Sequence, residues 1–432
     1  MKKSIRVIKK MNPQDTVKNN DDVNCLLIWP PLIIENTIMP LSIPSLLAYL
    51  KKHHINTTEV FDANSFYKQL GLFGLLFRIH KGYKSFVRRI YKRPNLKAKL
   101  PFNIYVNDNI GKRGQPKNLN KQRLFSQFIV DYKRFTERMF LKLISYIVRR
   151  ELGIREWSFS SMMQYVFETP LNNKNIEKKS WAILKSISHI NKFRLIGISV
   201  VYPAQLLFAL VIAKELKRKY GEEIYIVLGG PQISEHVNML IQNQHIYQCV
   251  DFLVCNDGEE ALLEIIRRVN RKDFAGIPNT YHKDSSMTSY RKYEKIFHMN
   301  PECFLVPDFS GFDLCQYTND IPILVSRGCF WGRCNFCTYP LLYNCRYCIA
   351  SIDRTVGILN ELKKNYGAHS YFFVDDALPP QFMRKLAIEL IKSGLNIKWG
   401  CSIILDNEFA DHDFCYTLAK SGLSHVSIGF ES

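Results

Sequence analysis

Short hydrophobic runs alternate with amphipathic stretches over the first part of the chain. The runs expected to form strands are VNCLLIWPP from Val23, TTEVFDAN, RLIGISVV, EIYIVLGG and VDFLVC. The stretches expected to form helices are SIPSLLAYLKKHHI, PAQLLFALVIAKELKRKYG, which ends at Gly221, and EEALLEIIRRV. Strands that alternate with helices indicate a parallel sheet covered by helices on both faces. We therefore expect a doubly wound α/β domain over residues 23–270.

A second alternating series begins at IPILVSRGC and occupies residues 321–432. Its later helices and strands are expected in TVGILNELKKNYG, YFFVDD, QFMRKLAIELIKSG, IKWGCSIIL, FCYTLAKSG and HVSIGFES. Residues 271–320 contain prolines and polar stretches, which predict a hairpin-bearing linker between the two series. Residues 1–22 are basic and polar and form an N-terminal tail.

Positive charge is concentrated in residues 65–194, which interrupt the first series. This segment holds 28 of the 59 Lys and Arg residues but 7 of the 39 Asp and Glu residues. The net charge of +20 therefore comes from this segment, while the rest of the chain is nearly neutral. Amphipathic stretches such as RLFSQFIVDYKRFTERMFLKLISYIVRR predict a helical insert. Its basic face is either simply solvated or a surface for an acidic partner such as RNA, a leader peptide or membrane phosphates.

The start of the chain has the positive flank of a signal peptide, but polar residues follow where an apolar region would be needed. The longest early apolar run, Leu70 to Phe77, is roughly ten residues short of a bilayer span. We therefore expect a cytoplasmic protein without a transmembrane segment. In that compartment the 12 cysteines are expected to be metal ligands, catalytic thiols or core residues, not a disulfide framework.

The pattern Cys329-x4-Cys334-x2-Cys337 places three thiols on one loop directly after an expected strand. Thiolates are soft ligands that suit iron and zinc. Three ligands on one loop would leave one iron of a cubane cluster open to a chelating substrate. Structural zinc is the alternative, with Cys345 or Cys348 as the fourth ligand. Those two cysteines form a second C-x2-C, which is either part of an auxiliary cluster or a pair of ordinary thiols.

The motifs SRGCFWGRCNFC, FVDDALPP, IKWGCSIIL and SIGFES together resemble radical S-adenosylmethionine enzymes. Upstream, VNCLLIWPP, RLIGISVV, YIVLGGP and VDFLVCNDGEEALLE are similar to the branch of that family with an N-terminal cobalamin-binding-type domain. The resemblance covers residues 23–62 and 195–432. It implies a cobalamin-binding-like doubly wound domain followed by a partial (β/α) barrel.

The resemblance also implies cofactors and roles. Cys329, Cys334 and Cys337 would ligate a [4Fe–4S] cluster that chelates S-adenosylmethionine and cleaves it reductively to a 5′-deoxyadenosyl radical. A flavodoxin or ferredoxin would supply the electron. The expected S-adenosylmethionine contacts are Phe336 near the adenine, Asp375 and Asp376 near the ammonium, and Ser402, Glu431 and Ser432 at later strand ends.

Two pairs of residues, one of glycines and one of aspartates, have both a ligand-binding and a purely structural explanation. Gly229 and Gly230 end an expected strand, where they would either let cobalamin approach the backbone or simply form a tight turn. Asp375 and Asp376 could instead cap the helix that begins near Pro379.

The chain departs from the family pattern in four ways. Gly332 is an additional residue in the usual C-x3-C-x2-C spacing. Ile404 stands where relatives often carry an arginine that contacts the methionine carboxylate. Asp62 begins no D-x-H-x-x-G motif, so cobalamin would bind without a protein histidine or be absent. The chain also supplies about four of the six βα units of the family barrel, so we expect a fragment or a truncated gene product.

These observations predict a radical S-adenosylmethionine enzyme. With cobalamin bound, the resemblance implies methyl transfer or another modification of an inert carbon, with a peptide or natural product as substrate. The alternatives are an inactive truncated remnant and a tRNA-modifying protein that docks through the basic insert.

Overall fold

The computed structural model describes most of both predicted α/β series. The described residues are 23–31, 39–67, 162–168, 175–283, 289–293, 295–317, 320–343 and 346–429. Several predictions fall outside this set: the N-terminal tail, most of the basic insert with its acidic-partner surface, Cys345, Glu431 and Ser432. Across the described part of the chain, no helix is long and apolar enough to cross a membrane.

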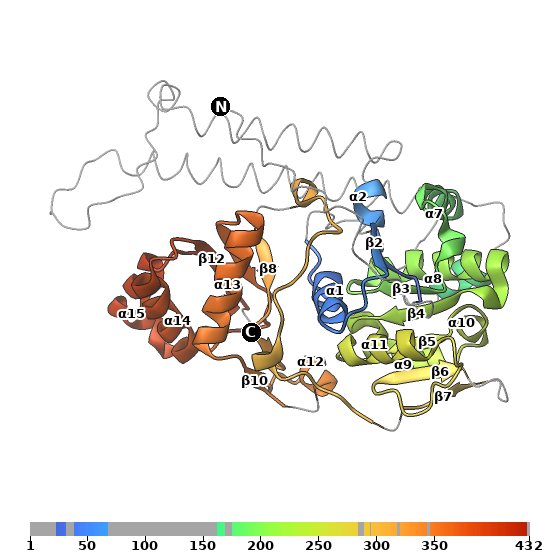
Figure 1. The fold of residues 1–432 in the computed structure, drawn as a ribbon. Helices are drawn as coiled ribbons and strands as arrows, with labels where there is room; N and C mark the ends of the chain where they lie inside the picture. The colour runs from blue at the N-terminus through green and yellow to red at the C-terminus, as the bar shows by residue number, and fades with distance from the viewer. Residues whose placement is uncertain are drawn as a thin grey trace, which may run out of the picture.

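The first sheet has seven strands in the order β2-β1-β3-β4-β5-β6-β7 (Figure 1). Its parallel strands are β1 (Cys25–Trp29), β2 (Thr58–Asp62), β3 (Leu195–Ser199), β4 (Tyr225–Gly229) and β5 (Phe252–Val254). Strands β6 (Thr280–Lys283) and β7 (Tyr290–Arg291) extend it antiparallel. These two strands lie within the segment expected to be a hairpin-bearing linker.

Helices cover both faces of the first sheet, as the alternating pattern predicted. Alternate residues of β1 pack to opposite sides, with Leu27 on one face and Ile28 on the other. The Leu27 face is covered by α1 (Ser42–Lys52) and α11 (Glu259–Arg268). The opposite face is covered by α7 (Asn175–Ser186), α8 (Pro203–Tyr220), α9 (Pro231–Ile241) and α10 (Gln244–Cys249). A short helix, α2 (Ala63–Tyr67), follows β2. The doubly wound prediction is confirmed.

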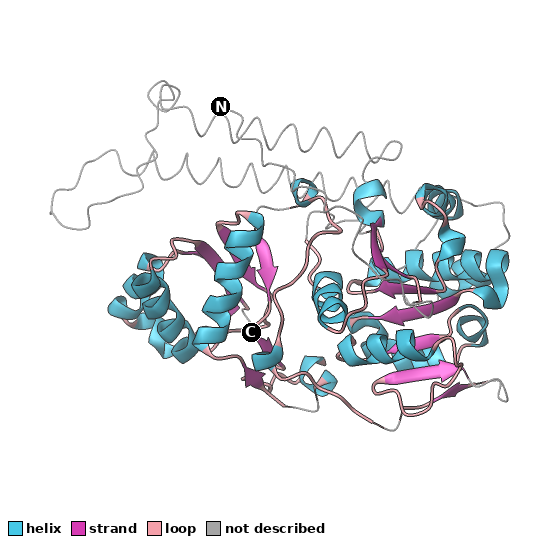
Figure 2. Ribbon diagram, in the orientation of Figure 1, coloured by secondary structure: helices cyan, strands magenta, loops and turns pink. Residues whose placement is uncertain are grey.

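The second sheet has four parallel strands in the described part of the chain, in the order β13-β12-β11-β8. They are β8 (Ile321–Ile323), β11 (Ser370–Phe373), β12 (Lys398–Ile403) and β13 (Leu423–Ile428). Helices α13 (Ile352–Tyr366), α14 (Pro380–Ser393) and α15 (His412–Lys420) lie together on its outer side (Figure 2). Tyr371, Phe373 and Trp399 are fully buried beneath these helices.

Residues 295–317 run between the two sheets and contact both. The hydroxyl of Tyr317 donates to Asp62 at the end of β2, with an oxygen–oxygen distance of 2.6 Å. The backbone N–H of Phe309 donates to the Tyr366 hydroxyl at the end of α13, at 2.9 Å. One hydrophobic core continues from the α1 side of the first sheet into the second sheet. The two sheets are therefore packed through a shared apolar core, not joined by the chain alone.

Candidate functional site

The cysteine loop, residues 328–343 and 346–347 in the described chain, follows β8 of the second sheet after residues 324–327. Two-residue strands close its base, where β9 (Ser326–Arg327) pairs antiparallel with β10 (Cys348–Ile349). Gly328 has a φ of 78°, and a Cβ there would lie 2.0 Å from the carbonyl oxygen of Arg346. Only glycine allows the two sides of the loop to approach this closely.

Gly332 accommodates the additional residue in the cysteine spacing. Its φ of 59° lies in the left-handed region, where glycine is favoured. The turn it makes lies between Cys329 and Cys334, so the longer spacing is taken up locally within the loop. The loop contains one short helix, α12 (Tyr339–Leu342).

Cys329, Cys334 and Cys337 are all partly exposed. The backbone N–H of Cys337 donates to the carbonyl of Cys334 at 3.1 Å, so these two cysteines share one turn. Within the residues that the structure describes, no three Cys, His, Asp or Glu side chains converge closely enough to hold a metal ion. The three cysteines fit a thiolate-ligated cluster by the chemistry of their donors, as partly exposed soft ligands on one loop, and not by a convergence of their side chains.

Two aromatic side chains of the cysteine loop are exposed. Phe336, the predicted adenine contact, is 68% exposed, and Trp331 is 46% exposed. The guanidinium of Arg333 lies 5.6 Å from the centre of the Trp331 ring. Cys348, the alternative zinc ligand, lies on β10 directly opposite Arg327 and is also exposed.

Asp375 follows β11 and is buried under the start of the cysteine loop. Its Oδ1 accepts hydrogen bonds from the backbone N–H of Ser326 at 2.7 Å and of Val325 at 3.2 Å. The Ser326 hydroxyl donates to the same oxygen. Burial raises the pKa of Asp375 to about 6, although these hydrogen bonds favour the ionised form. The carboxylate therefore holds the backbone that leads into the loop.

Asp376 and Ser402 lie at the same end of the second sheet as Asp375. Asp376 is exposed. Partial desolvation raises the pKa of its carboxyl, and a hydrogen bond with Tyr339 offsets part of that increase. The carbonyl of Ser402 on β12 accepts from the backbone N–H of Leu378 at 3.1 Å. These predicted S-adenosylmethionine residues thus lie near the cysteine loop, as expected for carboxyl ends of adjacent parallel strands.

The helix-capping alternative for the two aspartates is not what the structure shows. Helix α14 begins at Pro380 with Pro379 as its N-cap residue and no side-chain hydrogen bond to the cap. The polar contacts of Asp375 instead go to residues 325 and 326. A role toward S-adenosylmethionine stays a prediction for both carboxylates.

The Gly229–Gly230 turn lies at the carboxyl end of β4. Gly230 has a φ of 107°, and a Cβ there would lie 2.5 Å from the carbonyl oxygen of Val200. The same carbonyl accepts from the backbone N–H of Gln232 at 3.2 Å. Close packing of the turn against the end of β3 therefore accounts for Gly230 without a ligand, and the cobalamin role stays a prediction.

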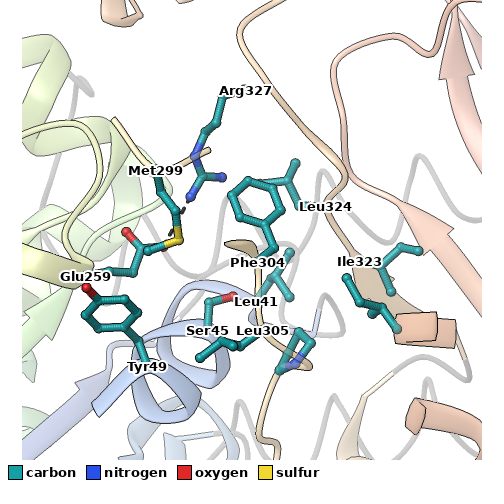
Figure 3. Close-up of a pocket in the computed structure, with 12 residues that line it drawn as sticks. Leu41, Ser45, Tyr49, Glu259, Met299, Phe304, Leu305, Ile323, Leu324 and Arg327 are labelled. Atoms are coloured by element: carbon teal, nitrogen blue, oxygen red, sulfur yellow. Dashed lines mark hydrogen bonds and ion pairs between the residues drawn. The ribbon is translucent and has the colours of Figure 1, made fainter. Parts of the chain in front are cut away.

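A buried ion-pair network beside the cysteine loop was missed by reasoning from the sequence. Arg327 Nε lies 2.7 Å from Asp257 Oδ1. Arg327 Nη2 lies 3.2 Å from Glu259 Oε1, a contact that Figure 3 shows. The guanidinium carbon is 4.5 Å from the centre of the Phe304 ring. Burial alone would lower the pKa of Arg327, but the two carboxylates raise it. The guanidinium therefore stays charged.

The seam between the two sheets contains a small cavity next to this network. Its volume is about 30 Å³, and residues of α1, the 299–307 segment and β8 line it together with Arg327 and Glu259 (Figure 3). A space of this size holds roughly one or two water molecules. It is too small for S-adenosylmethionine or cobalamin.

Comparison with known proteins supports the fold. No family model matches the chain. It is 25% identical over 231 residues to the uncharacterized methyltransferase PH0819 of Pyrococcus horikoshii. The match covers 52% of this chain and 49% of that protein, so the chain spans about half the length of this relative.

The structure resembles OxsB, described as a cobalamin-dependent S-adenosylmethionine radical enzyme. The TM-score is 0.54 at 13% identity with the form that has aqua-cobalamin and S-adenosylmethionine bound. It is also 0.54 with the form that has aqua-cobalamin bound. Each likeness covers 95% of this chain and 44% of OxsB. The chain thus has the mixed α/β fold of that enzyme, with its large parallel sheet.

Proposed function

We propose that this protein is a radical S-adenosylmethionine enzyme that transfers a methyl group. One observation carries the proposal: three partly exposed cysteine side chains share a loop that follows the carboxyl end of a strand in a parallel sheet. Two further findings support it. The fold resembles that of a cobalamin-dependent radical enzyme, and the sequence resembles that of a methyltransferase.

Cys329, Cys334 and Cys337 would hold a [4Fe–4S] cluster, which supplies one electron for cleavage of the sulfonium of S-adenosylmethionine. The chain's own side chains would bind and orient the substrate around it. Phe336 is free to stack on the adenine because its ring is exposed. Asp376 is the better candidate of the two aspartates for the ammonium, since the Asp375 carboxylate already accepts three hydrogen bonds.

The proposed cobalamin site lies along the carboxyl ends of the first sheet, where ligands bind in doubly wound folds. Gly229 and Gly230 have no side chains there, and Gly230 packs closely against the Val200 backbone after β3. Asp62 begins no D-x-H-x-x-G motif, since Ala63 and Asn64 follow it, and its carboxylate accepts from Tyr317 and from the backbone N–H of Ser65. Cobalamin would therefore bind here without a histidine from that position.

The proposal extends to the location, electron donor, substrate and domain roles of the protein. We place the enzyme in the cytoplasm, with a flavodoxin or ferredoxin as electron donor and a peptide or natural product as substrate. Residues 23–270 would form the cobalamin-binding unit and residues 321–432 the radical unit, with 271–320 between them.

The proposal is tested by anaerobic reconstitution of wild type, Cys334→Ala and Cys315→Ala with iron and sulfide. Cys315 is the matched control, because it is an exposed free thiol outside the cysteine loop. Wild type and the control should bind about four iron and four sulfide per chain, and Cys334→Ala clearly less. With dithionite and S-adenosylmethionine, only wild type and Cys315→Ala should form 5′-deoxyadenosine.

Two results would overturn the assignment. One is a metal content of zinc alone. The other is a cluster unaffected by the loss of Cys334. A reconstituted wild type that does not cleave S-adenosylmethionine would instead favour an inactive remnant. Titration with hydroxocobalamin, followed by absorbance after gel filtration, tests the cobalamin site separately.

A further inference from the structure

The Arg327 network connects the base of the cysteine loop to the first sheet. Arg327 is separated from Cys329 by Gly328 alone, whereas Asp257 and Glu259 lie in the turn after β5 and at the start of α11. The side chain of Arg327 is 12% exposed and that of Asp257 is 2% exposed. The contact therefore crosses the seam between the two sheets inside the protein (Figure 3).

Asp257 is itself held from several directions. Its Oδ2 accepts from the backbone N–H of Met299 at 2.9 Å. Its carbonyl accepts from Asn279 Nδ2 at 3.0 Å, and Asn279 is completely buried. The ring of His298 also lies beside it, with Nδ1 3.6 Å from Oδ2. Because these contacts fix its position, Asp257 can hold the arginine in place.

Helix α9 contacts both the acidic turn and the cysteine loop. The backbone N–H of Asn256 donates to the Ser234 hydroxyl at 2.8 Å. Thr338, one residue after Cys337, donates to Glu235 at 3.5 Å. The helix begins directly after Gly230, at the edge proposed for cobalamin. The residues on either side of the three cysteines, Arg327 and Thr338, thus both contact the region around α9 and the turn after β5.

We propose that Arg327 is a positioning residue, which fixes the cysteine loop against the carboxyl end of the first sheet through Asp257 and Glu259. The physical basis is the cost of an unpaired buried charge: if the loop swings away, the Arg327 guanidinium loses both of its carboxylate partners. The planar guanidinium can reach both carboxylates at once, which an ammonium cannot. The inference rests on the proposed function only where it treats this loop as the cluster loop.

Hydrogen exchange on the full-length, metal-free protein tests the positioning directly. The variants are Arg327→Gln and, as a matched control, Arg384→Gln, which removes an exposed arginine–aspartate pair of 3.1 Å in the second sheet's helices. In Arg327→Gln, amides of residues 326–343 should exchange at least about tenfold faster, with no change in β3 and β4. The control should leave both regions unchanged.

Unchanged exchange in 326–343 would refute the proposal, as would an equal loss of protection in β3 and β4. If Arg327→Gln is recovered only unfolded, Arg327→Lys decides, because it keeps the charge and loses the two-carboxylate contact. A smaller increase confined to 326–343 would then support positioning, and no increase would refute it.

Iron binding separates this inference from the proposed function. Arg327→Gln retains all three cysteines, so a displaced loop should lower the iron bound per chain at limiting iron by at least about twofold, and Arg327→Lys should restore part of it. Equal iron uptake by wild type and Arg327→Gln would count against positioning. If wild type itself bound no iron, the proposed function would fail while the exchange result still stood.

Discussion

Replacing Asp375 by asparagine should remove a pH dependence of stability that the buried carboxylate creates. Burial raises the pKa of Asp375 from its ordinary 3.8 to about 6. The folded state therefore holds this proton more tightly than the unfolded chain does. Its contribution to stability is complete below about pH 4 and is lost as the pH rises through about 6. The difference in pKa corresponds to about 3 kcal/mol, because each pKa unit is worth about 1.36 kcal/mol.

Asparagine suits this test because it preserves the hydrogen bonds. Oδ1 accepts all three bonds from residues 325 and 326, so an amide oxygen in the same place keeps them. At neutral pH, Asp375→Asn should thus be as stable as wild type or more stable. Asp375→Ala should instead be destabilised by at least about 2 kcal/mol, because it leaves buried donors without an acceptor.

The assay is urea denaturation at pH values between about 4 and 7.5, followed by tryptophan fluorescence. Buried Trp399 on β12 contacts Phe373 of the neighbouring strand and reports on this sheet. The free energy of unfolding of Asp375→Asn minus that of wild type should rise by roughly 2.4 kcal/mol across this range, because the remainder of the change falls below about pH 4. In the control Asp411→Asn this difference should stay nearly flat, since Arg384 lowers the pKa of Asp411 and the stability that it contributes is lost only below about pH 4. A flat difference for Asp375→Asn would refute the reasoning.

Gly328→Ala and Gly230→Ala test the backbone at the two predicted sites, with Gly357→Ala as the control. Gly328→Ala should destabilise the cysteine loop by at least about 2 kcal/mol, because its Cβ would meet the Arg346 carbonyl at 2.0 Å and its φ is positive. Gly357→Ala in α13, where nothing lies within 4 Å of the new Cβ, should stabilise by about 0.5–1 kcal/mol. Gly230→Ala should cost about 1–3 kcal/mol in protein never exposed to cobalamin, because its Cβ would meet Val200. Urea denaturation measures all three, and an unaffected Gly230→Ala would contradict the packing explanation.

Much of the fold could be predicted from the sequence because its strands are buried and its helices amphipathic. Most strands of the first series are short apolar runs, and helices such as α1 and α11 show the period of one covered face. That alternation is enough to give a doubly wound sheet and a second series of parallel strands. The cysteine loop was equally visible, since three thiols at fixed spacing after a strand need no tertiary information to be recognised.

The partners of individual polar side chains could not be predicted, because they depend on which strand ends meet in space. Arg327 pairs with carboxylates 68 and 70 residues earlier in the chain, on the other sheet. Asp375 was expected to face a ligand, but the packing of β11 beside β8 directs it to the backbone of residues 325 and 326. The sequence by itself determined the elements and the chemistry of the loop. The tertiary structure decided what holds that loop in place, because buried charges take their partners from whichever segments the fold brings together.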